Sequence, residues 1–535
     1  MDQTLSPSKS RSFSKHESSR RMSNLQSTLR DTYITENSDR SFSYSPSPVI
    51  KPYVYPTSSR DDDWMPQFEF FDLNEDKYQG YKSRFSRTSS LPEWTLDENG
   101  DVRSDLKLEN IIEEGLLIPF ATDKLGCHFL QSTFFGVPTN EKEQKLRDRI
   151  CKEILDTREM FLSLCRNIFG NFFLQRIIEF SNRPEQETIT KYICSDVTIL
   201  CLDKSACRVV QTALERMKPR FADMLVEAIP RDSRLMAICT DQNANHVIQK
   251  IVKTMPLRRW SFVVEFLCKS EEDNLLNVCQ DKYGCRVVQT IVEVLSNNDF
   301  EQKREERDIK MKFLHKLMTR ILTKCHKLTS NEFANYVIQH IISDRGVLTI
   351  YRDAIINKHL LRNLLSMSQE KYASHVVEQS LAHAPLHYLI DMMEEIFDGY
   401  VPHPESGKDA LDILIFHQFG NYVVQRMLQI CCDAISGKRD TILNGVNCRE
   451  KFETWLIKLH TKAKKEKHRL TRFSSGKKIL DILQTVDDNY EFGFYSSFNN
   501  NIGDTPPPTT SSMFTSSSMG WQSRRNSISS IDYPV

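Results

Sequence analysis

The sequence predicts an all-α protein whose folded part is a solenoid of eight helical repeats. Three observations support this prediction. Apolar residues recur at helical spacing over residues 92–488, a span too long for one compact helical bundle. The alternating patterns typical of β-strands are absent from that span. One string of five residues recurs eight times along it, which is typical of a repeat array.

Two flanking segments differ in composition from this span. Residues 1–91 are rich in Ser, Arg, Lys, Asp and Pro, and residues 489–535 are rich in Ser and Pro. Neither segment has enough contiguous apolar sequence to offset the entropy lost on folding, so both are expected to be disordered. The strings of Arg and Ser around Ser23 and Ser527 leave phosphorylation and a plain solvated tail equally open.

The composition excludes several classes of protein. The 71 Lys and Arg residues balance 71 Asp and Glu residues, so any basic surface must be local. No apolar leader and no apolar run long enough to span a bilayer is found, which predicts a soluble cytoplasmic protein without a membrane partner. The 14 cysteines are scattered without CxxC pairs or a zinc-like Cys/His spacing. We therefore expect buried free thiols, and neither a metal site nor a cofactor.

The repeated string has a defined composition. It consists of a small or amide residue, an aromatic residue or arginine, two apolar residues, and glutamine or glutamate. By subtraction of residue numbers, its copies begin 44, 36, 38, 40, 50, 39 and 47 residues apart, the period of a repeat of two or three helices. The copies are Cys127–Gln131, Asn171–Gln175, Cys207–Gln211, Asn245–Gln249, Cys285–Gln289, Asn335–Gln339, Ser374–Glu378 and Asn421–Gln425.

Helical geometry separates the five positions of the string. At about 100° per residue, the first and fifth positions share one face, the second lies beside them, and the third and fourth turn to the opposite side. Val287 and Val288 are therefore expected in the core. Cys285, Arg286 and Gln289 are expected to face outward together. Eight such helices stacked in register would line one continuous concave surface.

The outward residue types are suited to nucleobases. The second positions carry flat side chains, which can stack on a base. Asn with Gln offers donors and acceptors that match uracil, while a small Cys or Ser leaves room for a purine beside Gln. Glu378 only accepts hydrogen bonds when ionised, which suits the two adjacent donors of guanine. The candidate stacking residues are His128, Phe172, Arg208, His246, Arg286, Tyr336, His375 and Tyr422.

Two other classes of protein remain as alternatives. A protein-binding scaffold of the HEAT or armadillo kind has the same apolar period, and its inner face would bind a peptide. Such a scaffold is not expected to keep a restricted set of residues at three positions in eight repeats. An enzyme is disfavoured, because no pair of nucleophile and base emerges and FSSGKK at Phe473 lacks the first Gly of a phosphate loop.

Four lysines stand three residues before the first position of a string, near the start of the same predicted helix. They either contact RNA phosphates or only solvate the helix start, and the sequence leaves both possibilities open. They are Lys124, Lys204, Lys282 and Lys371.

The eight strings resemble the tripartite recognition motif of the Pumilio-homology, or PUF, family of RNA-binding proteins, over residues 92–488. The resemblance implies a right-handed superhelical solenoid of eight Pumilio-type repeats with flanking half-repeats. It also implies that single-stranded RNA binds antiparallel to the chain, one base for each repeat, with UGUAUAUA as the site. The implied base-edge residues are Cys127, Gln131, Asn171, Gln175, Cys207, Gln211, Asn245, Gln249, Cys285, Gln289, Asn335, Gln339, Ser374, Glu378, Asn421 and Gln425.

The resemblance implies a role and partners as well. The loops FDGYVPHPESGKDALDI and HRLTRFSSGKK look most like the nematode germline branch that includes the FBF proteins, whose members can accept a ninth, turned-out base. A monomer that binds mRNA 3′ untranslated regions and represses translation or destabilises the message is implied. Its implied protein partners are deadenylase-complex subunits and germline regulatory proteins, on the outer face and the loop between repeats seven and eight. Tyr400 is the candidate contact in that loop, with a plain connector as the alternative.

Overall fold

The computed structural model describes residues 89–297 and 304–489. Contacts divide the chain into Met1–Arg87 and Thr88–Val535, and every described residue belongs to the second unit. The disorder expected for residues 1–91 and 489–535 falls outside the described residues, apart from residues 89–91 and 489. Among the helices of the described part, none is both long enough and apolar enough to cross a membrane.

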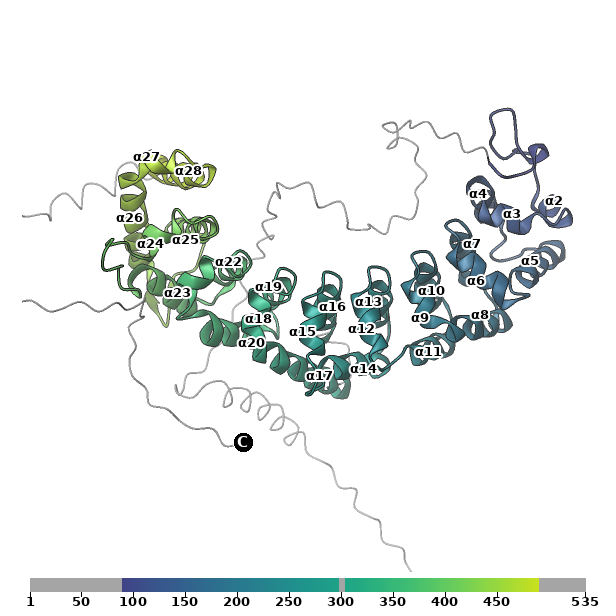
Figure 1. Ribbon diagram of the computed structural model, residues 1–535, viewed down its shortest axis with the longest axis horizontal. Coiled ribbons are helices and arrows are strands. Elements are labelled where there is room, and N and C mark those ends of the chain that lie inside the picture. Colours follow the sequence, from purple (N-terminus) through teal and green to yellow (C-terminus); the bar gives the residue numbers. More distant parts are fainter. Residues whose placement is uncertain (1–88, 298–303, 490–535) are drawn as a thin grey trace, which may run out of the picture. The chain divides into compact units, whose positions relative to one another are not determined.

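Each repeat is built from a short helix, a recognition helix that carries the five-residue string, and an outer helix. Figure 1 shows the recognition helices in one row and the outer helices in a second row. Each recognition helix packs on the next one along the row. The recognition helices are α4 (Lys124–Thr133), α7 (Gly170–Glu179), α10 (Ala206–Arg216), α13 (Asn245–Thr254), α16 (Gly284–Ser296), α19 (Asn335–Ser343), α22 (Ala373–His383) and α25 (Gly420–Ile435).

The short helices precede the recognition helices and pack on them. This contact places the string on the same side of every repeat. The short helices are α3 (Leu117–Thr122), α6 (Arg158–Arg166), α9 (Val197–Leu202), α12 (Arg234–Thr240), α15 (Asn274–Cys279), α18 (Cys325–Thr329), α21 (Leu364–Ser368) and α24 (Ala410–Leu414).

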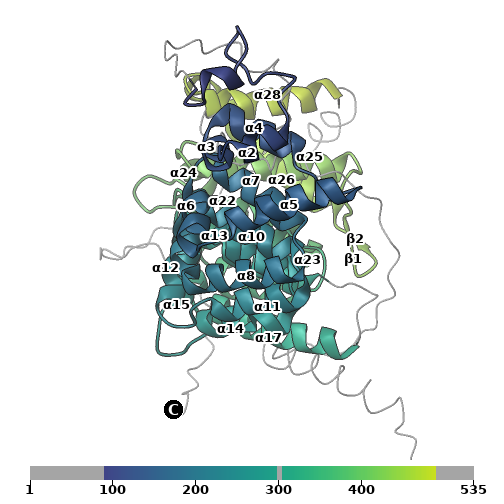
Figure 2. The ribbon, with the colours of Figure 1, turned by 90° about the vertical axis from the view of Figure 1, so that its right-hand side faces the viewer.

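The outer helices form the second row, in which α8, α11 and α14 follow one another in Figure 2 and each packs on the next. Proline stands at the start of several of them, including Pro219 of α11 and the cap Pro256 of α14, where its missing N–H costs nothing. The row consists of α5 (Glu141–Ile154), α8 (Arg183–Ser195), α11 (Pro219–Ala228), α14 (Leu257–Leu267), α17 (Arg304–Thr323), α20 (Thr349–Ile355) continued by the π-helical turn η3 (Ile356–Leu360), α23 (Leu386–Asp398) and α26 (Arg449–Lys465).

Further elements flank the eight repeats at both ends. The helices η2 (Glu93–Thr95) and α2 (Leu108–Glu113) come before the first repeat, and α27 (Lys467–Leu470) and α28 (Ser474–Asn489) come after the last outer helix. The pair α27 and α28 repeats the order of a short helix before a recognition helix, and α28 packs on α25. The flanking half-repeats that were expected are therefore present.

Within residues 89–297 and 304–489, the all-α prediction has one exception longer than an isolated bridge, a hairpin between α25 and α26. Strands β1 (Ile442–Leu443) and β2 (Val446–Asn447) pair in antiparallel register. Asn444 and Gly445 form the turn with φ angles of 52° and 81°, which these two residue types tolerate best. Strands of two residues are too short to produce an alternating pattern, so no strand was predicted.

The third and fourth residues of the string supply the core of each recognition helix. Both are buried in repeats two to eight, and Val287 and Val288 are 0 % exposed, as predicted. In the first repeat Leu130 is buried and Phe129 is half-buried. Complete burial of such a side chain contributes about 1.5–3 kcal/mol, so the string stabilises the fold as well as shaping its surface.

Candidate nucleic-acid interface

The three remaining positions of the string differ in exposure. Second residues are the most exposed, with Tyr336 at 55 % and Tyr422 at 45 %. Fifth residues are half-buried, except Gln211, which is buried. First residues are almost completely buried, with Cys285 at 4 % and Asn335 at 1 %. The prediction that all three positions face outward together is therefore wrong for the first position, which lies at the base of the surface.

The burial of the first position follows from its place in the first turn of the helix, where it meets the preceding backbone. Asn245 Nδ2 donates to the carbonyl oxygens of Asp241 and Gln242, at 2.8 and 3.0 Å. The same pair of hydrogen bonds recurs in the second, sixth and eighth repeats, at Asn171, Asn335 and Asn421. These bonds turn the asparagine Oδ1 towards the fifth position of the string.

The glutamine at the fifth position donates to that asparagine in the same four repeats. The distances from Nε2 to Oδ1 are 3.1 Å for Gln175, 2.7 Å for Gln249, 2.6 Å for Gln339 and 3.0 Å for Gln425. Each glutamine keeps a lone pair on Oε1, and Gln249, Gln339 and Gln425 keep a second N–H, whereas Gln175 Nε2 also donates to the backbone carbonyl oxygen of Asn171 at 3.2 Å. The paired amides can therefore present a donor beside an acceptor, which is the arrangement that uracil can match.

The other four repeats carry a small first residue, which bonds to the preceding turn in repeats three, five and seven, whereas Cys127 of the first repeat donates from Sγ to the carbonyl oxygen of Phe169 at 3.1 Å. Cys207 and Cys285 donate from Sγ to the carbonyl oxygens of Lys204 and Lys282, both at 3.4 Å. Burial raises the pKa of the Cys285 thiol to about 11, so it stays protonated at neutral pH. These cysteines leave space beside the glutamine and take no part in thiol chemistry.

The seventh repeat differs in the chemistry of its fifth position. Ser374 Oγ donates to the carbonyl oxygen of Lys371 at 3.2 Å, as the cysteines do. Glu378 Oε1 is buried and, among the described residues, accepts no hydrogen bond; the ring nitrogen Nδ1 of His375 lies 3.5 Å away. A buried carboxylate oxygen without a donor costs free energy, which a ligand with N–H groups would offset.

A cap that the sequence analysis missed begins the recognition helices. Asp281 Oδ1 accepts from the backbone N–H groups of Tyr283 and Gly284, at 2.8 and 2.7 Å. In the seventh repeat Glu370 stands at this position and accepts from Ser330 Oγ at 2.6 Å instead. The recurrence of Asp or Asn four residues before the string was the signal that could have revealed it. The other capping residues are Asp123, Asn167, Asp203, Asp241, Asn331 and, through Nδ1, His417.

Comparison with known proteins identifies the family. Fem-3 mRNA-binding factor 1 of Caenorhabditis elegans is 48 % identical over 424 residues, which are 77 % of this chain and 68 % of that protein. The Pumilio-family RNA-binding repeat matches eight segments of the chain. The chain belongs to the Pumilio family of RNA-binding repeat proteins. Each matched Pumilio repeat contains one of the eight strings. They cover residues 117–155, 161–194, 197–229, 234–257, 274–302, 324–344, 363–397 and 414–435.

Two further relatives support the assignment to the Pumilio family. Fem-3 mRNA-binding factor 2 of Caenorhabditis elegans is 49 % identical over 412 residues, 75 % of this chain and 64 % of that protein. The chain thus spans about two thirds of the length of Fem-3 mRNA-binding factors 1 and 2. The crystal structure of PUF-6 in complex with 5BE13 RNA matches with a TM-score of 0.64 at 40 % identity, over 71 % of this chain and 100 % of that one. Pumilio proteins are a non-enzymatic family, which confirms that the chain is not an enzyme.

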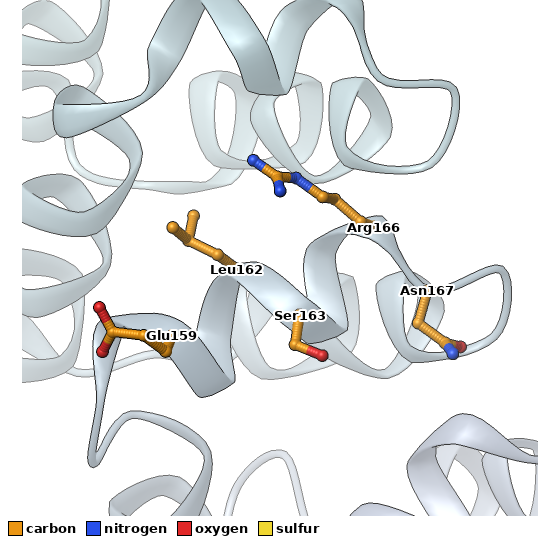
Figure 3. A pocket seen from close by; sticks show the side chains of 5 residues that line it. All are labelled: Glu159, Leu162, Ser163, Arg166 and Asn167. Atoms are coloured by element: carbon orange, nitrogen blue, oxygen red, sulfur yellow. The ribbon is translucent and has the colours of Figure 1, made fainter.

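A hollow beside α6 is lined by none of the string residues of the Pumilio repeats. Figure 3 shows its lining residues, and Leu162 and Arg166 extend from the same side of the helix. All of the lining comes from α6 and the residue after it, and Asn167 is committed to capping α7. The hollow contains no base-reading residue. It is lined by Glu159, Leu162, Ser163, Arg166 and Asn167.

Tyr400, the candidate partner contact of Pumilio repeat seven, has a hydroxyl that is engaged within the protein. It donates to the Glu395 carboxylate and accepts from the backbone N–H of Leu365 at 3.0 Å. Burial, followed by the charge of Glu395, raises the pKa of Tyr400 well above its ordinary value. Tyr400 thus holds the start of α21. Its ring and the neighbouring Val401, which is 51 % exposed, are the parts left for a partner.

A metal site in the Pumilio repeats would need several Cys, His, Asp or Glu side chains close together. All fourteen cysteines lie in the described residues and are free thiols. Within residues 89–297 and 304–489, no group of three or more His, Cys, Asp or Glu side chains is arranged to hold a metal ion.

Proposed function

We propose that the Pumilio repeats read single-stranded mRNA in 3′ untranslated regions, one base for each repeat, with UGUAUAUA as the preferred site. The observation that carries this proposal is an alternation along the row of recognition helices. Hydrogen-bonded Asn–Gln pairs occupy repeats two, four, six and eight, and strings with a small first residue occupy the repeats between them. This order corresponds to alternating uracils and purines when RNA runs antiparallel to the chain.

Guanine is assigned to the second base through Glu378. Guanine offers N1–H and an N2 amine side by side, and the buried Oε1 of Glu378 accepts no hydrogen bond from the described residues. Adenine offers only its N6 amine beside the acceptor N1, so binding it would leave one carboxylate oxygen facing another acceptor. The small Ser374 leaves the space that a purine needs.

The names of the relatives support mRNA as the ligand. Two of them are mRNA-binding factors, and PUF-6 was crystallised with RNA. We propose that this chain acts in the same way as a cytoplasmic monomer and that it lowers translation or stability of the bound message. We further propose that it does so by recruiting deadenylase-complex subunits and germline regulatory proteins through the outer row and the loop after Tyr400.

The assignment of bases is tested by exchanging the code of one repeat. The double variant Ser374→Asn, Glu378→Gln gives repeat seven the residues of a uracil repeat. Its preference at the second base should move from guanine towards uracil by about 5- to 150-fold, because one or two hydrogen bonds exchange partners. Fluorescence anisotropy with UGUAUAUA and UUUAUAUA, each also in a nine-base form with one additional central base, measures this preference and the footprint together.

A matched control makes the opposite change in the neighbouring repeat. Asn335→Ser with Gln339→Glu should move the preference at the third base towards guanine and leave the preference at the second base unchanged.

A reporter mRNA with UGUAUAUA in its 3′ untranslated region tests the proposed repression. The wild type should repress its translation, and the repeat-seven variant should not. If the second-base preference does not move, the code assignment of repeat seven is wrong. If the wild type binds none of these RNAs, a peptide-binding scaffold becomes the better explanation.

A further inference from the structure

Two threonines join neighbouring repeats at their base-reading glutamines. Thr212 of α10 donates from Oγ1 to Gln175 Oε1 at 3.0 Å, and Thr290 of α16 donates to Gln249 Oε1 at 3.1 Å. Each threonine directly follows the fifth residue of its own string, one repeat further along the chain than the glutamine that it contacts. The same contact therefore occurs twice, between repeats two and three and between repeats four and five.

The threonine contact gives the glutamine amide a second anchor. Gln175 Nε2 already donates to Asn171 Oδ1 at 3.1 Å, so the threonine holds the other end of the amide. The asparagine is itself fixed, because its Nδ2 donates to the carbonyl oxygens of Asn167 and Ile168 at 2.9 and 3.0 Å. In these two repeats the glutamine can leave its place only by losing hydrogen bonds at both ends.

The sixth repeat provides an internal contrast. Gln339 donates to Asn335 Oδ1 at 2.6 Å, as the other two glutamines do to their asparagines. The residue of repeat seven that corresponds to the threonines is Gln379, whose Oε1 accepts from Ser343 Oγ at 3.5 Å. In the described residues Gln339 therefore has one anchor where Gln175 and Gln249 have two.

The second anchor of the glutamine matters most for discrimination between uracil and cytosine. Uracil presents N3–H to the glutamine Oε1 and a carbonyl oxygen to Nε2. Cytosine in the same place presents an unprotonated N3, so that two acceptors face each other. The repulsion is relieved only if the glutamine moves away, and the cost of that movement rises with the number of bonds that it breaks.

We propose that Thr212 and Thr290 are positioning residues that raise the preference for uracil over cytosine at the bases read by repeats two and four. This inference rests on the proposed function and extends it. To the three recognition residues of a string it adds a fourth, which the next repeat contributes. It also predicts that repeat six discriminates these two bases less sharply than repeats two and four do.

The test replaces each threonine with valine, which keeps the branched shape and removes the hydroxyl. The RNAs are UGUAUAUA and the same sequence with cytosine at the third, fifth or seventh base. Thr212→Val should lower the ratio of affinities for uracil and cytosine at the seventh base by about 2- to 10-fold, the worth of one hydrogen bond. Thr290→Val should do so at the fifth base. Neither should change the ratio at the third base.

The serine variants Thr212→Ser and Thr290→Ser provide the matched controls, because they retain the hydroxyl and should keep the wild-type ratios. The inference is overturned if Thr212→Val leaves the seventh-base ratio unchanged, if all three ratios fall together, or if serine fails to restore them. Each of these outcomes leaves the proposed function intact as long as UGUAUAUA is still bound. If the wild type does not distinguish the two bases at any position, the proposed function fails and this inference fails with it.

Discussion

Under the proposed function, the asparagines at the first position of the string have two tasks, because one amide both holds the backbone and faces the base. The amide nitrogen of Asn421 donates to the carbonyl oxygens of His417 and Gln418, at 2.8 and 2.9 Å, while its Oδ1 accepts from Gln425. Replacement of such an asparagine removes a helix-start contact as well as a base contact. A cysteine or serine needs only a single hydrogen bond to the preceding turn, so those positions are the better choices for changing base preference alone.

A pH dependence is expected at His246, the candidate stacking residue of repeat four. Burial lowers its pKa below the ordinary value of 6.5, and the positive charges of Arg208 and Arg286 lower it further. The folded protein therefore binds this proton less readily than the unfolded chain. The contribution of His246 to the free energy of unfolding is fully present above pH 6.5 and is lost as the pH falls through 6.5 towards the folded pKa.

An NMR titration of the His246 ring measures this directly. The midpoint should lie below the ordinary value in the wild type and should rise in Arg208→Gln, because one of the neighbouring charges is gone. Arg220→Gln, on the outer helix α11, is the control and should leave the midpoint unchanged. A midpoint at or above the ordinary value in the wild type would contradict the expectation.

The short helix and the recognition helix of a repeat approach each other so closely that only a small residue fits just before the string. A Cβ atom on Gly284 would lie 2.4 Å from the carbonyl oxygen of Val278, and one on Gly126 would lie 2.6 Å from Phe120 Cα. This contact sets the angle at which the string is presented. The eight small residues are Gly126, Gly170, Ala206, Ala244, Gly284, Ala334, Ala373 and Gly420.

Gly284→Ala should therefore destabilise the protein by about 1–3 kcal/mol, because a backbone atom of the short helix must move. The gain in helix propensity, at most about 1 kcal/mol, does not offset this cost. Gly420→Ala is the matched comparison. Its Cβ would meet Leu414 Cδ2 at 2.6 Å, a methyl group that can rotate away, so a smaller loss is expected. Urea unfolding followed by circular dichroism ranks the two variants; a larger loss for Gly420→Ala would refute the packing argument.

The helical class and the number of repeats were predictable from the sequence because they depend on local periodicity. The string recurs eight times, and its apolar pair has the spacing of a buried stripe, so the burial of Val287 and Val288 followed directly. Features that depend on the distance between elements were not predictable from the sequence. The depth of Cys285, the contact of Thr212 with Gln175 and the engaged hydroxyl of Tyr400 all require knowledge of how one helix sits on another.

The whole chain carries no net charge, so RNA phosphates must be attracted by cations placed locally. Exposed lysines occur at one position of every repeat that is proposed to read a purine. Lys124 begins α4, whereas the other three stand in the turn just before their helices. Lys282 and Lys371 lie over the rings of Tyr283 and Tyr372, with Nζ 5.6 and 5.0 Å from the ring centres. The repeats that are proposed to read uracil have Ile168, Gln242, Glu332 and Gln418 at this position.

These lysines are expected to account for much of the salt dependence of RNA binding. Release of counterions from single-stranded RNA changes the slope of log affinity against log salt by about 0.7 for each phosphate contact. A variant with all four lysines replaced by glutamine should therefore lose up to about 2.8 from the magnitude of the slope while keeping its preference among bases. The replaced residues are Lys124, Lys204, Lys282 and Lys371.

The control variant removes the same number of charges from the outer helices α5 and α8, at Lys142, Lys145, Lys152 and Lys191. Both variants have the same net charge, so a general electrostatic effect would change the two slopes equally. Contact with phosphates would change only the slope of the first variant, because the outer helices lie in the other row (Figure 1). Equal slopes for both variants and the wild type would mean that the four lysines only solvate the helix starts, and that stacking and base-edge hydrogen bonds provide the affinity.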